Sequence, residues 1–156
     1  MDKATLELEL IFDPLPSEAL TRLLTDNLVS VSLARTGAAD WHEVGFFLKN
    51  PRGEWLGGLI GTIWGGWLHV KFLWVAEAMR GQRHGTRLMD AAEAMAIERG
   101  AFAATLETAT FQAPDFYAKR GYTVFGRLDD YPPGHVKLYL SKRLTAPPPS
   151  VFVREV

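Results

Sequence analysis

The sequence predicts a single α/β domain, because strand-like and helix-like segments alternate along its 156 residues. Several short runs place apolar residues at every second position and end at glycine or proline. Two longer runs place them at helical spacing instead. A chain of this length is long enough to bury a sizeable core. We assign the domain to residues 1–144 and treat residues 145–156, with three consecutive prolines, as an extended tail.

The first predicted strand covers residues 5–12, where leucine alternates with threonine or glutamate. Pro14 and Pro16 end it, and Ser17 is placed to cap a following helix. The apolar positions of that helix are Leu20, Leu23, Leu24 and Leu28. A loop is expected over residues 35–40.

A pair of strands is predicted at residues 43–49 and 54–64, joined by a turn at 50–53 that contains proline and glycine. The apolar run over residues 55–75 is long enough to suggest a membrane span. His69, Lys71 and the Gly65-Gly66 pair instead favour two buried strands with a tight turn between them. The third strand is therefore Trp67–Val75, and the side chains expected on one face are Leu68, Val70, Phe72 and Trp74.

The second half of the chain continues the alternation. A helix is predicted over residues 86–99, ended by Gly100, and its buried positions are Leu88, Ala92, Met95 and Ala96. Further predicted elements are a strand at 101–108, a short helix at Pro114–Lys119 and strands at 122–128 and 135–144. In the tail, residues 151–153 could add a strand to a partner.

Composition narrows the possible functions. The chain has 17 basic and 18 acidic residues, so no overall field favours nucleic acid. It has no cysteine, which excludes disulfides, thiolate metal sites and a cysteine nucleophile. The start of the chain does not look like a signal peptide. We therefore expect a cytoplasmic protein with no metal, nucleic-acid or membrane partner.

The basic loop Arg80-Gly81-Gln82-Arg83-His84-Gly85 lies between the third strand and the long helix. Backbone N–H groups at such a junction converge on one point, and the helix dipole adds positive potential there. The loop therefore predicts a site for phosphate or pyrophosphate. The motif of nucleotide hydrolases, Gly-x-x-x-x-Gly-Lys-Ser/Thr, is absent, and so is the Gly-x-Gly-x-x-Gly motif of dinucleotide oxidoreductases.

This loop, together with a downstream Ala113-x-x-x-Tyr117-x-x-x-Gly121-Tyr122 pattern, resembles the GNAT superfamily of N-acetyltransferases. The resemblance covers about residues 67–144. It implies a mostly antiparallel twisted sheet flanked by helices, with a splayed pair of strands that forms a cleft for acetyl-CoA. Arg83 stands where the family has a glycine, and we expect its backbone dihedrals to be ordinary, because a positive φ costs about 1 kcal/mol or more.

The resemblance also implies which residues bind the cofactor. The backbone of the third strand would pair with the pantetheine arm, the loop would bind the pyrophosphate, and Thr110 or Gln112 would take the place of an asparagine that contacts pantetheine. The implied set is Leu73, Trp74, Val75, Arg80, Gly81, Gln82, Arg83, His84, Gly85, Thr86, Arg87, Thr110 and Gln112.

Three residues are candidates for the chemistry that the resemblance implies, direct attack of an amine on acetyl-CoA. His69 matches the position of a general base, and imidazole side chains titrate close to neutral pH. Glu107 is the rival base, and a water molecule could link the two. Tyr117 matches the general acid that protonates the leaving thiolate. Each has a purely structural alternative, as a strand residue or a packed aromatic ring.

The sequence does not identify the acceptor. Aromatic and acidic groups could hold a small cationic amine, and the candidates are Trp64, Trp67, Tyr131 and His135. We expect a small-molecule primary amine, such as a polyamine, an amino acid or an aminoglycoside-like compound. The alternatives are a protein amine, a longer acyl group, or an acetyl-CoA-binding sensor without catalysis. The family and the tail suggest a homodimer.

Overall fold

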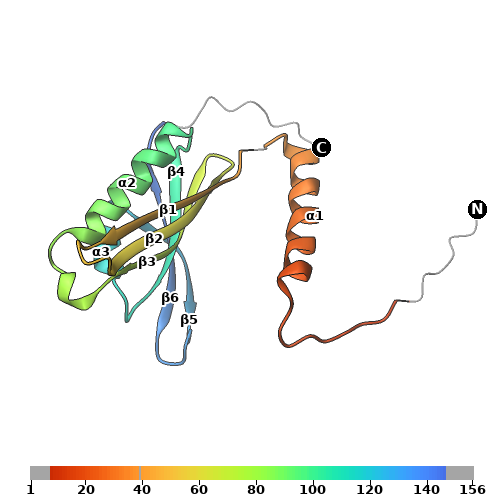
Figure 1. The fold of residues 1–156 in the computed structure, drawn as a ribbon, viewed down its shortest axis with the longest axis horizontal. Coiled ribbons are helices and arrows are strands. Elements are labelled where there is room, and N and C mark those ends of the chain that lie inside the picture. The colour runs from red at the N-terminus through yellow and green to blue at the C-terminus, as the bar shows by residue number, and fades with distance from the viewer. Residues whose placement is uncertain (1–7, 39, 147–156) are drawn as a thin grey trace, which may run out of the picture. The chain divides into compact units, whose positions relative to one another are not determined.

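The computed structural model describes residues 8–38 and 40–146, and the chain divides after Ala38 into two compact units (Figure 1). In the first unit, helix α1 covers Glu18–Thr36. The Ser17 side chain accepts a hydrogen bond from the Leu20 N–H at 3.2 Å, as a capping serine does. At the other end Gly37 takes a left-handed φ of 68°, and its N–H donates to the Leu33 carbonyl.

The prediction of a first strand is wrong for the described part of it. Residues 8–12 form no strand, and residues 5–7 lie outside the described residues, as does the proposed strand at 151–153. Alternation of side chains makes a strand only where a neighbouring strand supplies hydrogen bonds, and the described sheet contains no such neighbour for residues 8–12. The expected loop is also shorter than predicted, because α1 continues to Thr36.

The second unit is built on a six-stranded mixed sheet with the strand order β1-β2-β3-β4-β6-β5. Neighbouring strands are antiparallel except β3 and β4, which run parallel. This confirms the predicted α+β fold with a mostly antiparallel sheet. The strands are β1 (His42–Lys49), β2 (Trp55–Trp64), β3 (Trp67–Val75), β4 (Ala103–Ala109), β5 (Thr123–Asp129) and β6 (Val136–Arg143).

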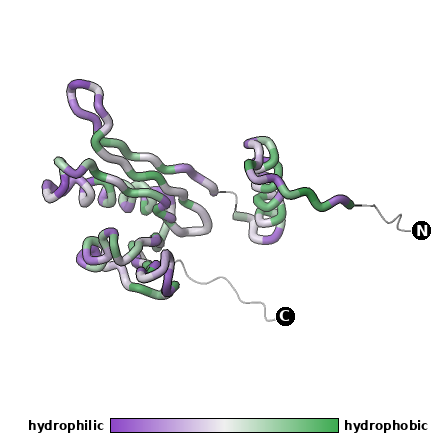
Figure 2. The backbone as a smooth tube through the Cα atoms, turned by 90° about the horizontal axis from the view of Figure 1, so that it is seen from below, coloured by the Kyte–Doolittle hydropathy of each residue, from purple (hydrophilic) through white to green (hydrophobic). Residues whose placement is uncertain are grey.

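Two helices and a short 3-10 turn complete this unit. The turn, η1, covers Glu77–Met79, α2 covers His84–Glu98 and α3 covers Pro114–Lys119. Helix α2 packs on one face of the sheet and supplies the buried side chains Leu88, Met89, Ala92 and Ala96, while the predicted Met95 is only partly buried (Figure 1). The strands are largely hydrophobic, whereas hydrophilic residues gather in the connections (Figure 2). No helix of the described residues is long and apolar enough to cross a membrane.

The hairpin between β2 and β3 forms as predicted, with Gly65 and Gly66 at φ values of 56° and 81°. Further along this pair the register shifts, so that Ile60 faces Phe72 while Gly61 faces Val70. Lys71 is therefore an extra residue, and the side chains after it change face. Leu73 and Val75 pack against the core, whereas Phe72 is 70% exposed. The prediction that Phe72 and Trp74 lie on the same face as Leu68 and Val70 is wrong for this reason.

The parallel strands β3 and β4 pair over only part of their length. Pairing runs from Trp67 opposite Ala103 to Val70 opposite Leu106, and then stops. Both strands continue, β3 to Val75 and β4 to Ala109, without hydrogen bonding to each other. The sheet therefore opens at its centre, and the free backbone edges face the gap.

Candidate active site

A cleft with a volume of about 900 Å³ lies where β3 and β4 separate. It is closed at one end by the basic loop before α2 and flanked by α3. Its lining includes the residues Lys71, Phe72, Leu73, Trp74, Val75, Met79, Arg80, Gly81, Arg83, His84, Gly85, Thr86, Glu107, Thr108, Phe111, Gln112, Ala113, Phe116 and Tyr117. The cleft therefore contains most of the residues that the sequence predicted for cofactor binding.

The strand side of the cleft is a backbone edge. Leu73 and Trp74 pair with β2 on one side only, opposite Leu59 and Gly58. On the other side the pairing with β4 has already ended at Val70. An extended ligand with amide groups could bond to this edge as an additional strand would.

The basic loop is held to the end of β3 by its first arginine. Arg80 Nε donates to the Val75 carbonyl at 3.1 Å, and the Gln82 side chain donates to the Ala78 carbonyl at 3.2 Å. Gly81 follows in a left-handed conformation, with a φ of 74°. The loop therefore leads directly into the first turn of α2, whose N–H groups have no acceptor within the helix.

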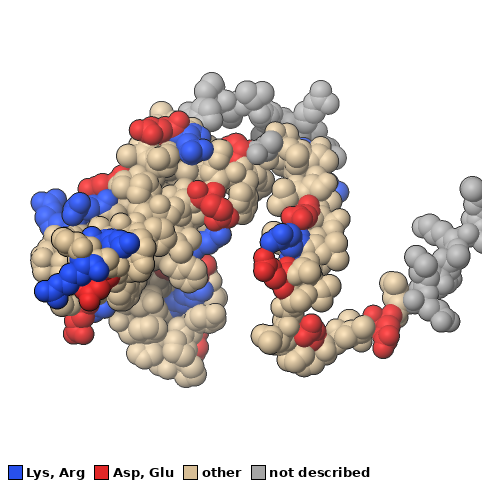
Figure 3. Space-filling view, viewed as in Figure 1, with Lys and Arg blue, Asp and Glu red and all other residues tan. Residues whose placement is uncertain are grey.

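Arg83 does not have the ordinary backbone that we expected. Its φ is 64° and its ψ is 13°, the left-handed conformation that a glycine would take at this N-cap position. Arg83 therefore has the backbone of a glycine and carries strain, and its exposed cationic side chain lies at the cleft. Lys and Arg side chains gather on the side of this unit where the loop lies (Figure 3).

Not all predicted cofactor residues reach the cleft. Gln82, Arg87 and Thr110 are not part of its lining. The Thr110 hydroxyl instead accepts a hydrogen bond from the Val136 N–H at 3.1 Å, which ties the loop after β4 to β6. Gln112 does line the cleft, and its side-chain oxygen accepts from the Ala109 N–H at 2.9 Å. His84 also lines the cleft, with its Nδ1 buried and without a hydrogen-bond partner.

Tyr117 faces the cleft from α3 and is only 8% exposed. Its ring packs edge-on against Phe116, at 5.1 Å between centroids, and against Tyr122, at 6.0 Å. Burial raises the pKa of the Tyr117 phenol above its ordinary value. The phenol therefore keeps its proton at neutral pH and can donate it to a developing anion.

The two candidate bases differ in position. Glu107 lies on β4 immediately after the last paired residue and lines the cleft, where it forms an ion pair with Lys137. His69 lies before the point of separation, between Thr62 on β2 and Thr105 on β4, and is not part of the lining. The structure thus brings Glu107 and Tyr117 together in one cleft and leaves His69 within the paired sheet.

The predicted acceptor residues also fall into two groups. Trp64 and Trp67 face each other at the β2–β3 hairpin, at the opposite end of β3 from the cleft. His135 packs edge-on against the cleft residue Phe111, with 5.0 Å between ring centroids. The ring centroid of Tyr131 lies 4.8 Å from Lys137 Nζ, and this ammonium group forms the ion pair with Glu107. Only the loop between β5 and β6 therefore places predicted acceptor residues next to the cleft.

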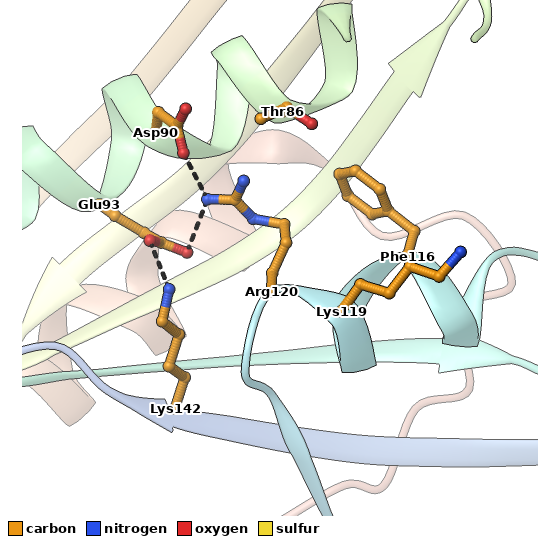
Figure 4. Close-up of a pocket in the computed structure, with 7 residues that line it drawn as sticks. All are labelled: Thr86, Asp90, Glu93, Phe116, Lys119, Arg120 and Lys142. Atoms are coloured by element: carbon orange, nitrogen blue, oxygen red, sulfur yellow. Dashed lines mark hydrogen bonds and ion pairs between the residues drawn. The ribbon is translucent and has the colours of Figure 1, made fainter.

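A charged cluster around the buried Glu93 was not predicted (Figure 4). Glu93 of α2 accepts hydrogen bonds from the Tyr122 hydroxyl at 3.0 Å and from Lys142 Nζ at 2.8 Å. Arg120 lies 3.3 Å from the same carboxylate and 2.7 Å from Asp90. This cluster joins α2, α3 and β6, and so it fixes the helix that carries Tyr117 relative to the helix that begins at the basic loop.

Sequence could have indicated part of this cluster. Glu93 is four residues after Met89 and three before Ala96, which places it on the buried face of α2. A carboxylate at such a position requires partners. Among the described residues, no group of three or more histidine, aspartate or glutamate side chains could hold a metal ion.

Comparison with known proteins agrees with this geometry. The profile of the Acetyltransferase (GNAT) family matches residues 11–122. The blasticidin-S acetyltransferase of Streptomyces morookaense is 46% identical over 94 residues, which are 60% of this chain and 69% of that protein.

Solved structures show the same fold. The crystal structure of a putative acetyltransferase from Agrobacterium tumefaciens has a TM-score of 0.81 and 32% identity, covering 87% of this chain and 99% of that one. A nourseothricin acetyltransferase has a TM-score of 0.57 and 30% identity, covering 68% of this chain and 66% of that one. The chain belongs to the GNAT family of acetyltransferases.

Proposed function

We propose that this acetyltransferase moves the acetyl group of acetyl-CoA to a primary amine of a small molecule, by direct attack within a ternary complex. The observation that carries the proposal is the cleft at the separation of β3 and β4, which holds Tyr117 and Glu107 and ends at the basic loop. The small-molecule acceptor is supported by the similarity to acetyltransferases named for blasticidin-S and nourseothricin.

In this proposal the donor lies along the cleft. The pyrophosphate binds at the N–H groups that begin α2, with Arg83 adding charge, and the pantetheine arm pairs with the free edge of β3 at Leu73 and Trp74. The cleft volume of about 900 Å³ is large enough for an extended ligand of this kind. The thioester then lies near the point where the strands separate.

Glu107 is the better candidate for the general base, although sequence alone favoured His69. The attacking amine arrives as an ammonium ion and must lose a proton, either directly to a base or through one water molecule. Glu107 lines the cleft where the strands separate, whereas His69 does not. We therefore assign proton removal to Glu107 and keep His69 as the second candidate.

Tyr117 is the proposed general acid. Its phenol lines the same cleft and keeps its proton at neutral pH because burial raises its pKa. Donation of that proton to the thiolate of CoA completes the transfer. The homodimer and the cytoplasmic location stay predictions from the sequence.

Release of free CoA in the presence of an amine panel tests the proposal. The panel includes blasticidin S, polyamines, amino acids and a lysine peptide, and each reaction is compared with one that lacks amine. We expect a small-molecule amine to stimulate CoA release. The mass of that amine should rise by about 42 units, because an acetyl group replaces one hydrogen on the nitrogen. Tight binding of acetyl-CoA without turnover of any amine would instead support the non-catalytic sensor.

A further inference from the structure

The ammonium group of Lys137 lies beside the proposed active site, against one carboxylate and two aromatic rings. Lys137 extends from β6, where its Cα lies opposite Ala109 of β4. Its Nζ forms an ion pair with Glu107, which lines the cleft. The same Nζ lies 4.8 Å from the ring centroid of Tyr131 and 5.5 Å from that of Tyr139.

These three partners are the groups that recognise an organic ammonium ion. A carboxylate supplies the opposite charge, and the faces of two aromatic rings attract a nearby cation. An acceptor amine needs the same surroundings, because it has to approach Glu107 and lose a proton there. The ammonium group of Lys137 therefore makes the contacts that we expect an incoming amine to make.

Lys137 is not part of the cleft lining, whereas Lys71 is, but the contacts of the Lys71 ammonium group differ. Its Nζ is 3.8 Å from Glu43 of β1 and 5.9 Å from the centroid of Trp41, so it pairs with groups outside the cleft lining. Lys137, in contrast, pairs with the cleft carboxylate itself. Of the two lysines, Lys137 is thus the one whose ammonium group contacts the proposed base.

We propose that Lys137 occupies the position of the acceptor amine, and that the enzyme acetylates Lys137 Nζ when acetyl-CoA is bound and no other amine is present. The inference deepens the proposed function and rests on it. It names a site of self-modification and indicates that acceptors bearing an ammonium group must displace Lys137 from Glu107.

The reaction at Lys137 has the same steps as transfer to a small amine. Glu107 takes a proton from the ammonium group, and the neutral Nζ attacks the carbonyl carbon of the thioester. The new C–N bond forms as the C–S bond breaks, and the Tyr117 hydroxyl gives its proton to the leaving sulfur. The nitrogen gives its second proton to the Tyr117 phenolate, which restores the phenol, and Glu107 releases the first proton to solvent. The products are N-acetyl-lysine and CoA.

The pH dependence of self-acetylation follows from the partners of Lys137. The hydrogen bond to Glu107 raises the pKa of the Lys137 ammonium, and the other titratable groups that face it are Tyr131 and Tyr139. At neutral pH nearly all of Lys137 is therefore charged and does not react. Self-acetylation is expected to be slow at pH 7 and to accelerate as the pH rises towards 9.

Mass spectrometry of the full chain after incubation with acetyl-CoA alone tests this inference. Lys49 serves as the internal control, because its Nζ also lies 4.8 Å from a ring centroid, that of Trp55, but outside the cleft lining. At pH 8.5 we expect Lys137 to be acetylated at least ~10-fold faster than Lys49, since Lys137 is held at the proposed base Glu107 and Lys49 is not. Tyr117→Phe should slow acetylation of Lys137 by roughly 100-fold and leave Lys49 unchanged.

Equal rates at Lys137 and Lys49 would overturn the inference, and so would a Lys137 rate that Tyr117→Phe leaves unchanged. The amine panel separates this failure from failure of the proposed function. A small amine that is acetylated while Lys137 is not refutes only the position of Lys137. If neither a small amine nor Lys137 is acetylated, both proposals are refuted.

Discussion

Replacement of Arg83 by glycine should stabilise the fold and weaken binding of the cofactor. Arg83 has a φ of 64°, and a non-glycine residue in this left-handed region costs about 1–2 kcal/mol. Glycine removes that cost, but its greater freedom in the unfolded chain returns about 0.4–1 kcal/mol. The free energy of unfolding should therefore rise by up to about 1.5 kcal/mol.

Arg83→Ala is the matched control, because alanine removes the charge and keeps the strain. Urea unfolding of both variants, followed by circular dichroism, should find the glycine variant more stable than the alanine variant by about 1 kcal/mol. Acetyl-CoA affinity, measured by calorimetry, should fall about 5- to 10-fold in both, as expected for one lost charge-assisted contact.

Two results would contradict the reasoning on Arg83. An alanine variant as stable as the glycine variant would show that the loop does not impose the left-handed backbone. Unchanged affinity in both variants would show that the arginine side chain does not contact the phosphates.

Two further predictions concern the charged cluster around Glu93 and its response to pH. Glu93→Gln removes the carboxylate that pairs with Lys142 and leaves Arg120 with Asp90 alone, so urea unfolding should show a loss of about 2–4 kcal/mol. A loss below about 0.5 kcal/mol would show that the cluster is well solvated. Burial, the negative charge of Glu93 and its hydrogen bond raise the pKa of the Tyr122 phenol above its ordinary 10.0. A raised pKa means that the associated stability is complete below pH 10 and is lost above it, by up to about 1.4 kcal/mol per pH unit. Urea midpoints between pH 8 and 11 should therefore fall less steeply in Tyr122→Phe than in the wild type, and equal slopes would refute the assignment.

Local sequence signals predicted the sheet unit well where one rule decides the structure. The Gly65-Gly66 pair predicted the β2–β3 turn, since both positions require positive φ. The side-chain alternation of β3 failed at Lys71, because a single extra residue moves all following side chains to the other face. Nothing in the alternation itself reveals such a bulge.

The candidate site was predictable in its residues more than in its arrangement. The resemblance to the family selected Tyr117, which lines the cleft, and His69, which does not, whereas the rival base Glu107 lines the cleft. The choice between Glu107 and His69 required the exact point at which β3 and β4 separate, which depends on tertiary pairing. The partners of Lys137 lie on three different segments, so no local pattern could have joined them.

The most direct test of the central claim is the rate of acetyl transfer by Tyr117→Phe, measured together with its affinity for acetyl-CoA. The wild type should acetylate at least one small-molecule amine of the panel. The variant should bind acetyl-CoA within about threefold of the wild type and turn over roughly 100-fold more slowly, because only the proton donor has been lost. Unchanged turnover in the variant would contradict the assignment of Tyr117 as the acid, and a wild type that binds acetyl-CoA yet acetylates no amine would contradict the proposed function itself.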